Sequence, residues 1–170
     1  MSSLRALRPL TRSIPRHTRL LNTDTAPILY SVSAKAIGAR NGHVEGSEGL
    51  KVDLGMPKAL GGKGGLNKTN PEELFAAGYG ACFQSAMNLV AHGEGVSMPP
   101  KAEDSVIDTT VHLVGDAKEG DLGIRVDMTV RVKGIEQGVL EKIVEKTKTV
   151  CPYSRATQGN VTTTVKVEKF

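Results

Sequence analysis

The chain contains two cysteines, Cys82 and Cys151, and the residue types elsewhere in the sequence favour thiol redox chemistry. A thiol reacts as the thiolate, and a fixed cation nearby lowers its pKa. Arg40 suits that role because its guanidinium stays charged and offers a planar fork of donors. A carboxylate such as Glu72 can hold one side of the fork by paired hydrogen bonds and leave the rest for the sulfur. A second thiol could then trap the oxidised sulfur before it is over-oxidised.

Each of these residues also has a purely structural interpretation. Cys82 could be a small buried hydrophobe, as most free cysteines are. Glu72 could be favoured only by the dipole at a helix N-terminus, and Arg40 could be a solvated turn residue. Glu73, three residues after Asn70, occupies the capping-box position, so Glu72 has no capping role of its own.

The spacing of Glu72 and Cys82 restricts how they could share a site. Ten residues separate them, which is about 15 Å along a continuous helix. Either the helix bends near Gly78 or Gly80, or Glu72 serves the Cys82 of a second subunit. We favour the second arrangement.

A helix is predicted to start at Asn70, a good N-cap, with Pro71 in the first helical position. Its residues are apolar nearly all round until Gly93 and Gly95 end it, which is typical of a buried central helix. One small sheet cannot cover every side of such a helix. We therefore expect an intertwined homodimer.

The remaining segments predict strands and one amphipathic helix. Asn41-Gly42 indicates a hairpin turn with positive φ at both positions, which places Arg40 at or just before the tip. Pro152 is expected to stop the amphipathic helix just after Cys151. The result is an α+β fold with mainly antiparallel pairing. Its expected strands are 30–36, 50–54, 107–113, 124–133 and 161–167, and its amphipathic helix carries the apolar stripe 139–147.

Charge and composition exclude several classes of protein. The chain has 22 Lys and Arg against 18 Asp and Glu, but five arginines and one acid lie before residue 28, so the remainder is balanced. A balanced body has no surplus of cations for binding nucleic acid. No run of residues is apolar enough for a membrane span. Two cysteines cannot make a structural zinc site unaided, and the histidines show no ligand spacing.

Residues 1–27 form a basic leader with spaced arginines, Ser and Thr, and no acid before Asp24. This composition is typical of an organelle transit peptide, so we expect mitochondrial import. The alternative is a disordered basic tail that is not a targeting signal, in which case the protein would be cytoplasmic. Residues 28–170 are expected to form a single folded domain.

Two long segments carry a family resemblance. NPEELFAAGYGACF, at 70–83, and CPYSRATQGN, at 151–160, resemble the signature segments of the organic hydroperoxide resistance (Ohr) branch of the Ohr/OsmC superfamily. The resemblance covers about residues 29–170 and includes GARNG around Arg40. It implies an OsmC-like fold, an intertwined dimer and a thiol peroxidase in which Cys82 is peroxidatic, Cys151 resolving, Arg40 activating and Glu72 its partner acid.

The resemblance further implies reduction of alkyl and fatty-acid hydroperoxides to alcohols, with no bound cofactor or metal. The implied reductant is dihydrolipoamide or a lipoylated enzyme. Apolar neighbours such as Phe75, Tyr79 and Phe83 would favour such apolar peroxides over hydrogen peroxide. Arg155 departs from the family, which usually has Asn after CPYS, and it could alter the pKa of Cys151 or the docking of the reductant. The alternatives are an OsmC-like peroxidase of different specificity and a non-enzymatic thiol redox sensor.

Overall fold

The computed structural model describes residues 22–170, so most of the predicted leader lies outside the described residues. The chain divides after Val32, and the unit Ser33–Phe170 contains every described helix and strand. The strands are β1 (Ala34–Ile37), β2 (His43–Gly46), β3 (Lys51–Asp53), β4 (Ser105–Asp116), β5 (Asp121–Val132) and β6 (Thr162–Val167). The helices are α1 (Pro71–Gly93), α2 (Gln137–Val150) and α3 (Pro152–Thr157), with short 3-10 turns between some of these elements.

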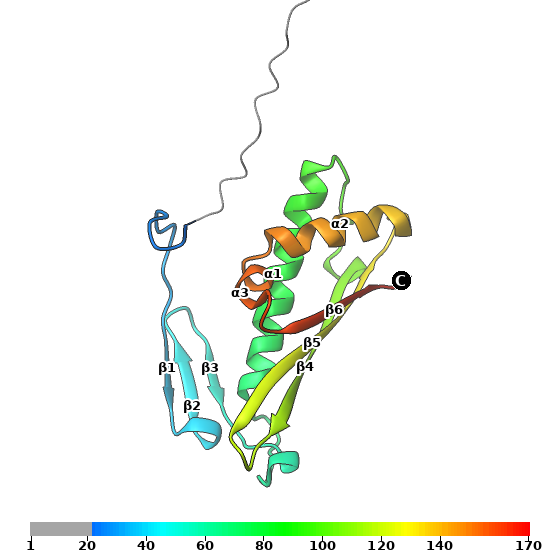
Figure 1. Ribbon diagram of the computed structural model, residues 1–170. Coiled ribbons are helices and arrows are strands. Elements are labelled where there is room, and N and C mark those ends of the chain that lie inside the picture. The colour runs from blue at the N-terminus through cyan, green and yellow to red at the C-terminus, as the bar shows by residue number, and fades with distance from the viewer. Residues whose placement is uncertain (1–21) are drawn as a thin grey trace, which may run out of the picture. The chain divides into compact units, whose positions relative to one another are not determined.

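The strands form two separate three-stranded sheets, in the orders β1-β2-β3 and β4-β5-β6. All pairs are antiparallel except β5 and β6, which run parallel. In Figure 1, α1 runs beside the larger sheet and α2 lies across α1, which agrees with the contacts among these elements. The prediction of an α+β fold with mainly antiparallel strands and a central helix is confirmed.

Helix α1 begins as its sequence predicts. The Asn70 side chain accepts a hydrogen bond from the backbone N–H of Glu73 at 2.8 Å, and Pro71 occupies the first turn. The Glu73 carboxylate accepts from the Thr69 hydroxyl at 2.6 Å. The start of the helix is thus fixed by Asn70 and Glu73, and Glu72 is left available for another partner.

The core lies between one side of α1, the inner face of β4-β5-β6 and the apolar stripe of α2. Burying these aliphatic and aromatic side chains is the main favourable term holding the three elements together. The most deeply buried members are Tyr79, Phe83, Met87, Ala91, Val126, Met128, Val130, Leu140, Ile143, Val144 and Cys151. Cys151 is therefore a core residue as well as a candidate for chemistry.

The described residues leave the opposite side of α1 uncovered. Ala77, Ala81, Ser85 and Leu89 recur at helical spacing and are exposed, and the Leu89 side chain is 65% exposed. We expected α1 to be buried on all sides, but the described residues of this chain bury only one side of it. None of the described helices is long and apolar enough to cross a lipid bilayer.

One of these local predictions was wrong, and one short helix was not predicted. The expected strand 30–36 begins only at Ala34, because its pairing with β2 runs from Ala34 to Ile37. In addition, α2 does end at Val150, but Pro152 then begins the short helix α3, which the sequence analysis did not predict. Proline is favoured at a first helical position because its missing N–H would be unpaired there anyway.

Candidate active site

The two cysteine sulfurs lie against each other. The Cys151 thiol donates to the Cys82 sulfur, with 3.4 Å between the two Sγ atoms, and both cysteines are free thiols. Cys151 is completely buried, whereas Cys82 is partly exposed. The sulfurs are close enough that small side-chain rotations could bring them to bonding distance. A reagent from solution has readier access to Cys82 than to Cys151.

Cys151 is positioned by the end of α2. The apolar stripe of that helix, including Leu140, Ile143 and Val144, is buried in the core. The Thr147 carbonyl accepts the backbone N–H of Cys151 at 2.9 Å, which continues the helical bonding by one residue. The packing of the apolar stripe of α2 therefore places Cys151 next to Cys82 of α1.

Three influences within the chain act on the pKa of Cys82, and their net effect is to raise it. Burial raises the pKa of the Cys82 thiol most strongly, the backbone N–H of Tyr153 lowers it, and the neighbouring Cys151 thiol adds to the rise. Among the described residues of one chain, no arginine contributes to this pKa shift. A thiol with a raised pKa is mostly protonated at neutral pH, so the described residues of one chain do not supply an activated Cys82.

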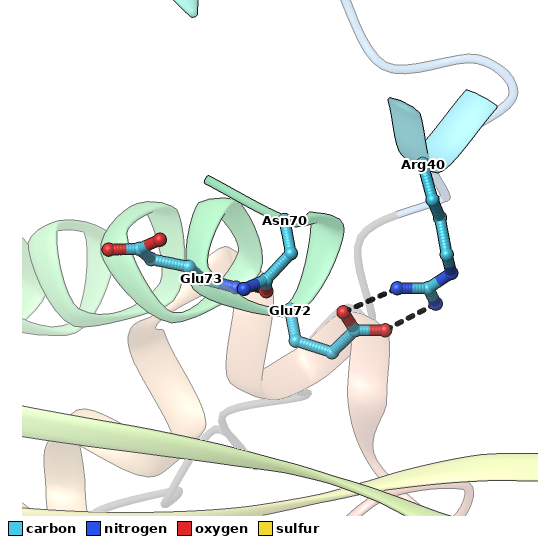
Figure 2. A network of polar contacts seen from close by, with 4 residues as sticks. All are labelled: Arg40, Asn70, Glu72 and Glu73. Atoms are coloured by element: carbon cyan, nitrogen blue, oxygen red, sulfur yellow. Dashed lines mark hydrogen bonds and ion pairs between the residues drawn. The ribbon is translucent and has the colours of Figure 1, made fainter. Parts of the chain in front are cut away.

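Arg40 and Glu72 form a second pair, shown in Figure 2. The Arg40 guanidinium donates to both oxygens of Glu72, at 2.8 and 2.6 Å, in a two-bonded arrangement. These bonds hold the pKa of Glu72 below its usual value and raise that of Arg40. Both groups are therefore charged across the physiological range.

The turn that carries Arg40 differs from the predicted one. Residues 38–42 connect β1 to β2, and positive φ occurs at Gly38 and Ala39 rather than at Asn41 and Gly42. Gly42 is required for a different reason: a Cβ there would lie 1.6 Å from the Ile37 carbonyl oxygen. The hairpin was predicted correctly, but the turn type was wrong.

The turn is attached to the start of α1 by backbone hydrogen bonds. Leu54 donates to the carbonyl of Gly42 at 2.7 Å and also forms an isolated parallel bridge with Thr69. Thr69 directly precedes the N-cap of α1, so the hairpin and the helix start are fixed relative to each other. This attachment explains how Arg40 and Glu72 meet although they are far apart in sequence.

The structure brings the four candidate residues together as two pairs. Helix α1 runs without interruption through Gly78 and Gly80, so the suggested bend is absent and Glu72 stays about 15 Å along the helix from Cys82. The glycines instead permit close packing. A Cβ on Gly80 would lie 2.7 Å from the Thr109 hydroxyl, and one on Gly78 would lie 3.4 Å from the Tyr153 ring.

Three aromatic rings lie where α3 packs against α1. Phe75, Tyr79 and Tyr153 form a triangle with ring centroids 5.8 to 6.3 Å apart. Phe83, expected as a neighbour of the site, is buried in the core. Sequence reasoning missed the hydrogen bond between Tyr79 and Ser154 and the role of the Tyr153 backbone. The position of Tyr79 three residues before Cys82 on the same helix was the available signal.

A sequence model of the OsmC-like protein family matches residues 62–166. An organic hydroperoxide resistance protein of Xanthomonas axonopodis pv. citri is 41% identical over 139 residues, which cover 81% of this chain and 94% of that protein. The chain belongs to the OsmC-like family, in its organic hydroperoxide resistance branch.

Other OsmC-like proteins agree in sequence and in fold. The organic hydroperoxide resistance protein OhrA of Bacillus subtilis is 40% identical over 142 residues, covering 82% of this chain and 96% of the relative. The crystal structure of an organic hydroperoxide resistance protein from Legionella pneumophila matches with a TM-score of 0.75 and 44% identity. That match covers 84% of this chain and 99% of the other.

Proposed function

We propose that this protein is a thiol peroxidase that reduces organic hydroperoxides to alcohols. The observation that carries the proposal is the contact between the two cysteine sulfurs, 3.4 Å apart, with Cys82 partly exposed and Cys151 buried. It is supported by relatives at about 40% identity that are named organic hydroperoxide resistance proteins.

The proposed cycle has three steps. The Cys82 thiolate attacks the outer oxygen of the hydroperoxide, the O–O bond breaks, and the alkoxide leaves as the alcohol after taking a proton. The resulting Cys82 sulfenic acid condenses with the Cys151 thiol, which forms a disulfide and releases water. A dihydrolipoyl dithiol then reduces the disulfide by two thiol–disulfide exchanges and is itself oxidised to the cyclic disulfide.

We propose that Arg40 of the partner subunit activates Cys82 in a homodimer. Within one chain Glu72, the partner of Arg40, lies about 15 Å along α1 from Cys82, and burial raises the pKa of the thiol. A guanidinium brought across the dimer interface would lower that pKa and stabilise the leaving alkoxide. Glu72 would keep the guanidinium oriented through its two hydrogen bonds.

Exposed apolar surface on this chain supports the dimer. The uncovered side of α1 presents Ala77, Ala81 and Leu89. Two apolar residues in or next to the small sheet, Ile37 at the end of β1 and Leu50 just before β3, are also each 43% exposed. Apolar surface of this kind, on two elements that flank the Arg40–Glu72 pair, is typical of a protein–protein interface.

The apolar wall of an open groove beside the aromatic triangle supports a preference for organic peroxides. Polar residues, among them Arg125, Asn160 and Thr162, line the rest of this groove. Phe75 packs against Tyr153, whose backbone acts on Cys82, and Phe75 also lines an open groove. The other apolar lining residues are Leu113, Val114, Leu122, Ile124, Ala156 and Val161. A hydrocarbon chain would be desolvated favourably there, whereas hydrogen peroxide would gain nothing from it.

Steady-state consumption of an alkyl hydroperoxide with three alternative reductants tests the proposed function. Turnover is expected with dihydrolipoamide and to be much slower with glutathione or a thioredoxin system. Consumption limited to one equivalent per subunit with all three reductants would instead indicate a redox sensor. No oxidation of Cys82 at all would contradict both functions.

Cys151→Ser is expected to consume one hydroperoxide per subunit and then lose activity. Without the resolving thiol, the Cys82 sulfenic acid persists and a second hydroperoxide converts it to sulfinic acid. Mass spectrometry of the Cys82 peptide after excess hydroperoxide measures this product. Sustained turnover by the variant, with no sulfinic acid, would show that Cys151 is not the resolving residue.

We propose that residues 1–27 direct the protein to mitochondria. The support is compositional: five arginines and a single acid in this segment, against a charge-balanced remainder. A fluorescent protein carrying residues 1–27 is expected to colocalise with a mitochondrial marker in eukaryotic cells. A diffuse cytoplasmic signal from the same fusion would contradict the proposal.

A further inference from the structure

The hydroxyl of Tyr79 is a buried polar group that the proposed cycle does not use. The Tyr79 side chain is 1% exposed, yet its hydroxyl donates to the Ser154 hydroxyl at 3.0 Å and lies 3.4 Å from that of Thr157. A buried hydroxyl that only filled space would be costly to desolvate. Here it is paired across two elements, from α1 to α3.

These hydroxyls belong to a clamp between the two helices. The Tyr79 ring also packs 5.8 Å from Phe75 of α1 and 5.9 Å from Tyr153 of α3. Two clamp residues thus lie on α1, and three, Tyr153, Ser154 and Thr157, lie on α3. Thr157 donates to the Tyr153 carbonyl at 2.8 Å, which closes the last turn of α3. Helix α3 has only six residues and would not be stable alone, so these contacts determine where it lies.

The position of α3 also determines the position of Cys151. Cys151 is the residue directly before α3, and its carbonyl accepts the backbone N–H of Arg155 at 3.0 Å. Tyr79, in turn, lies three residues before Cys82, on the same side of α1. The hydrogen bond from Tyr79 to Ser154 therefore connects the part of α1 that carries Cys82 to the start of α3, which directly follows Cys151.

We propose that Tyr79 is a positioning residue for disulfide closure, acting through Ser154 to hold Cys151 against Cys82. This inference rests on the proposed peroxidase function and adds to it. In the affected step the Cys151 sulfur attacks the Cys82 sulfenic sulfur. The S–O bond breaks, an S–S bond forms, and the hydroxyl leaves as water with the proton of the Cys151 thiol.

The proposal separates two steps of the cycle. Tyr79 bonds to neither sulfur, so the first reaction of Cys82 with hydroperoxide does not need its hydroxyl. Disulfide closure does need α3 in place. If α3 moves, Cys151 spends less time next to Cys82, so the effective concentration of one sulfur near the other falls. A hydrogen bond between neutral groups contributes enough to shift such an equilibrium about two- to tenfold.

Tyr79→Phe keeps the ring and removes the hydroxyl. One equivalent of hydroperoxide is added to the reduced full chain, and the sulfenic acid and the disulfide are followed by rapid quenching and mass spectrometry. We expect an unchanged rate of sulfenic acid formation and about two- to tenfold slower closure. The hydroperoxide concentration that over-oxidises half of Cys82 is expected to fall by the same factor.

Three further variants test whether the effect passes through Ser154. Ser154→Ala is expected to reproduce Tyr79→Phe, and the double variant to be no slower than either single variant. Ser154→Thr retains a hydroxyl and is expected to close at nearly the wild-type rate. Tyr30→Phe, at a tyrosine that is 82% exposed, controls for loss of a phenolic hydroxyl.

Wild-type closure in Tyr79→Phe would overturn the proposal, and so would equal slowing of both steps. A double variant slowed by the product of the two single effects would also overturn it, because Tyr79 and Ser154 would then act through separate contacts. Failure of the proposed function is a different result: wild-type Cys82 would form no sulfenic acid, and closure could not be followed in any variant.

Discussion

Replacing Cys82 with Ser is expected to abolish hydroperoxide reduction, by at least about a thousandfold in turnover, because a serine hydroxyl is un-ionised and weakly nucleophilic at neutral pH. The substitution changes one atom in a partly exposed side chain, so the fold should survive it. Hydroperoxide consumption with dihydrolipoamide measures the loss, and thermal unfolding of the variant checks the fold.

A matched control for Cys82→Ser lies one turn further along α1. Ser85 lies on the uncovered side of α1, and its hydroxyl donates to the Ala81 carbonyl of the same helix. Ser85→Ala keeps that surface small and apolar, so it should retain the dimer and full activity. Wild-type turnover by Cys82→Ser would remove the basis for assigning the chemistry to this sulfur.

Arg40→Ala is expected to slow the reaction of Cys82 with hydroperoxide about a hundredfold at neutral pH, because a nearby cation shifts a pKa by one to three units. Without the guanidinium, burial keeps the Cys82 pKa raised and the thiol is mostly protonated. The rate for the variant should therefore climb with pH well beyond neutrality, whereas the wild-type rate should already have levelled off. Stopped-flow measurement of the second-order rate constant against pH tests both curves.

Arg131 offers a matched control for Arg40. It is also a partly exposed arginine paired with carboxylates, here Asp108 and Glu168, but it lies on the outer face of the larger sheet. Arg131→Ala should leave the pH profile of the Cys82 reaction unchanged. An Arg40→Ala profile that coincides with the wild-type profile would mean that the guanidinium does not act on this thiol.

Co-expression of Arg40→Ala with Cys82→Ser shows which subunit supplies the arginine. If Arg40 acts across the interface, a mixed dimer combines an intact Cys82 with the intact Arg40 of the partner subunit and regains one working site. Each parent dimer has none. Mixed dimers as slow as Arg40→Ala alone would place the arginine and the thiol of a site in the same subunit.

Local rules and the long family signatures were sufficient to predict much of the fold. The cap at Asn70 and Pro71, the alternation in β4 and β5 and the stripe of α2 are each readable within a short window of sequence. These features fixed the order of the elements. Glu72 was singled out because Glu73 already explained the capping of α1, and the structure pairs Glu72 with Arg40.

The remaining features depend on contacts that a short window does not contain. The turn after β1 takes positive φ at Gly38 and Ala39, and its Gly42 packs closely against the Ile37 carbonyl. Helix α3 has too few residues to be recognised from its own propensity and is held by Tyr79 of α1. The separation of the Arg40–Glu72 pair from Cys82 likewise follows from an unbent α1.

The central claim is that Cys82 and Cys151 act as one redox couple on organic hydroperoxides. Peptide mapping of the alkylated protein, before and after one equivalent of an alkyl hydroperoxide, tests it most directly. We predict that the treated protein loses two hydrogen atoms per subunit and yields a single cross-linked peptide joining Cys82 to Cys151 of the same chain. Two fully alkylated cysteines after treatment, or a cross-link only between different chains, would contradict it.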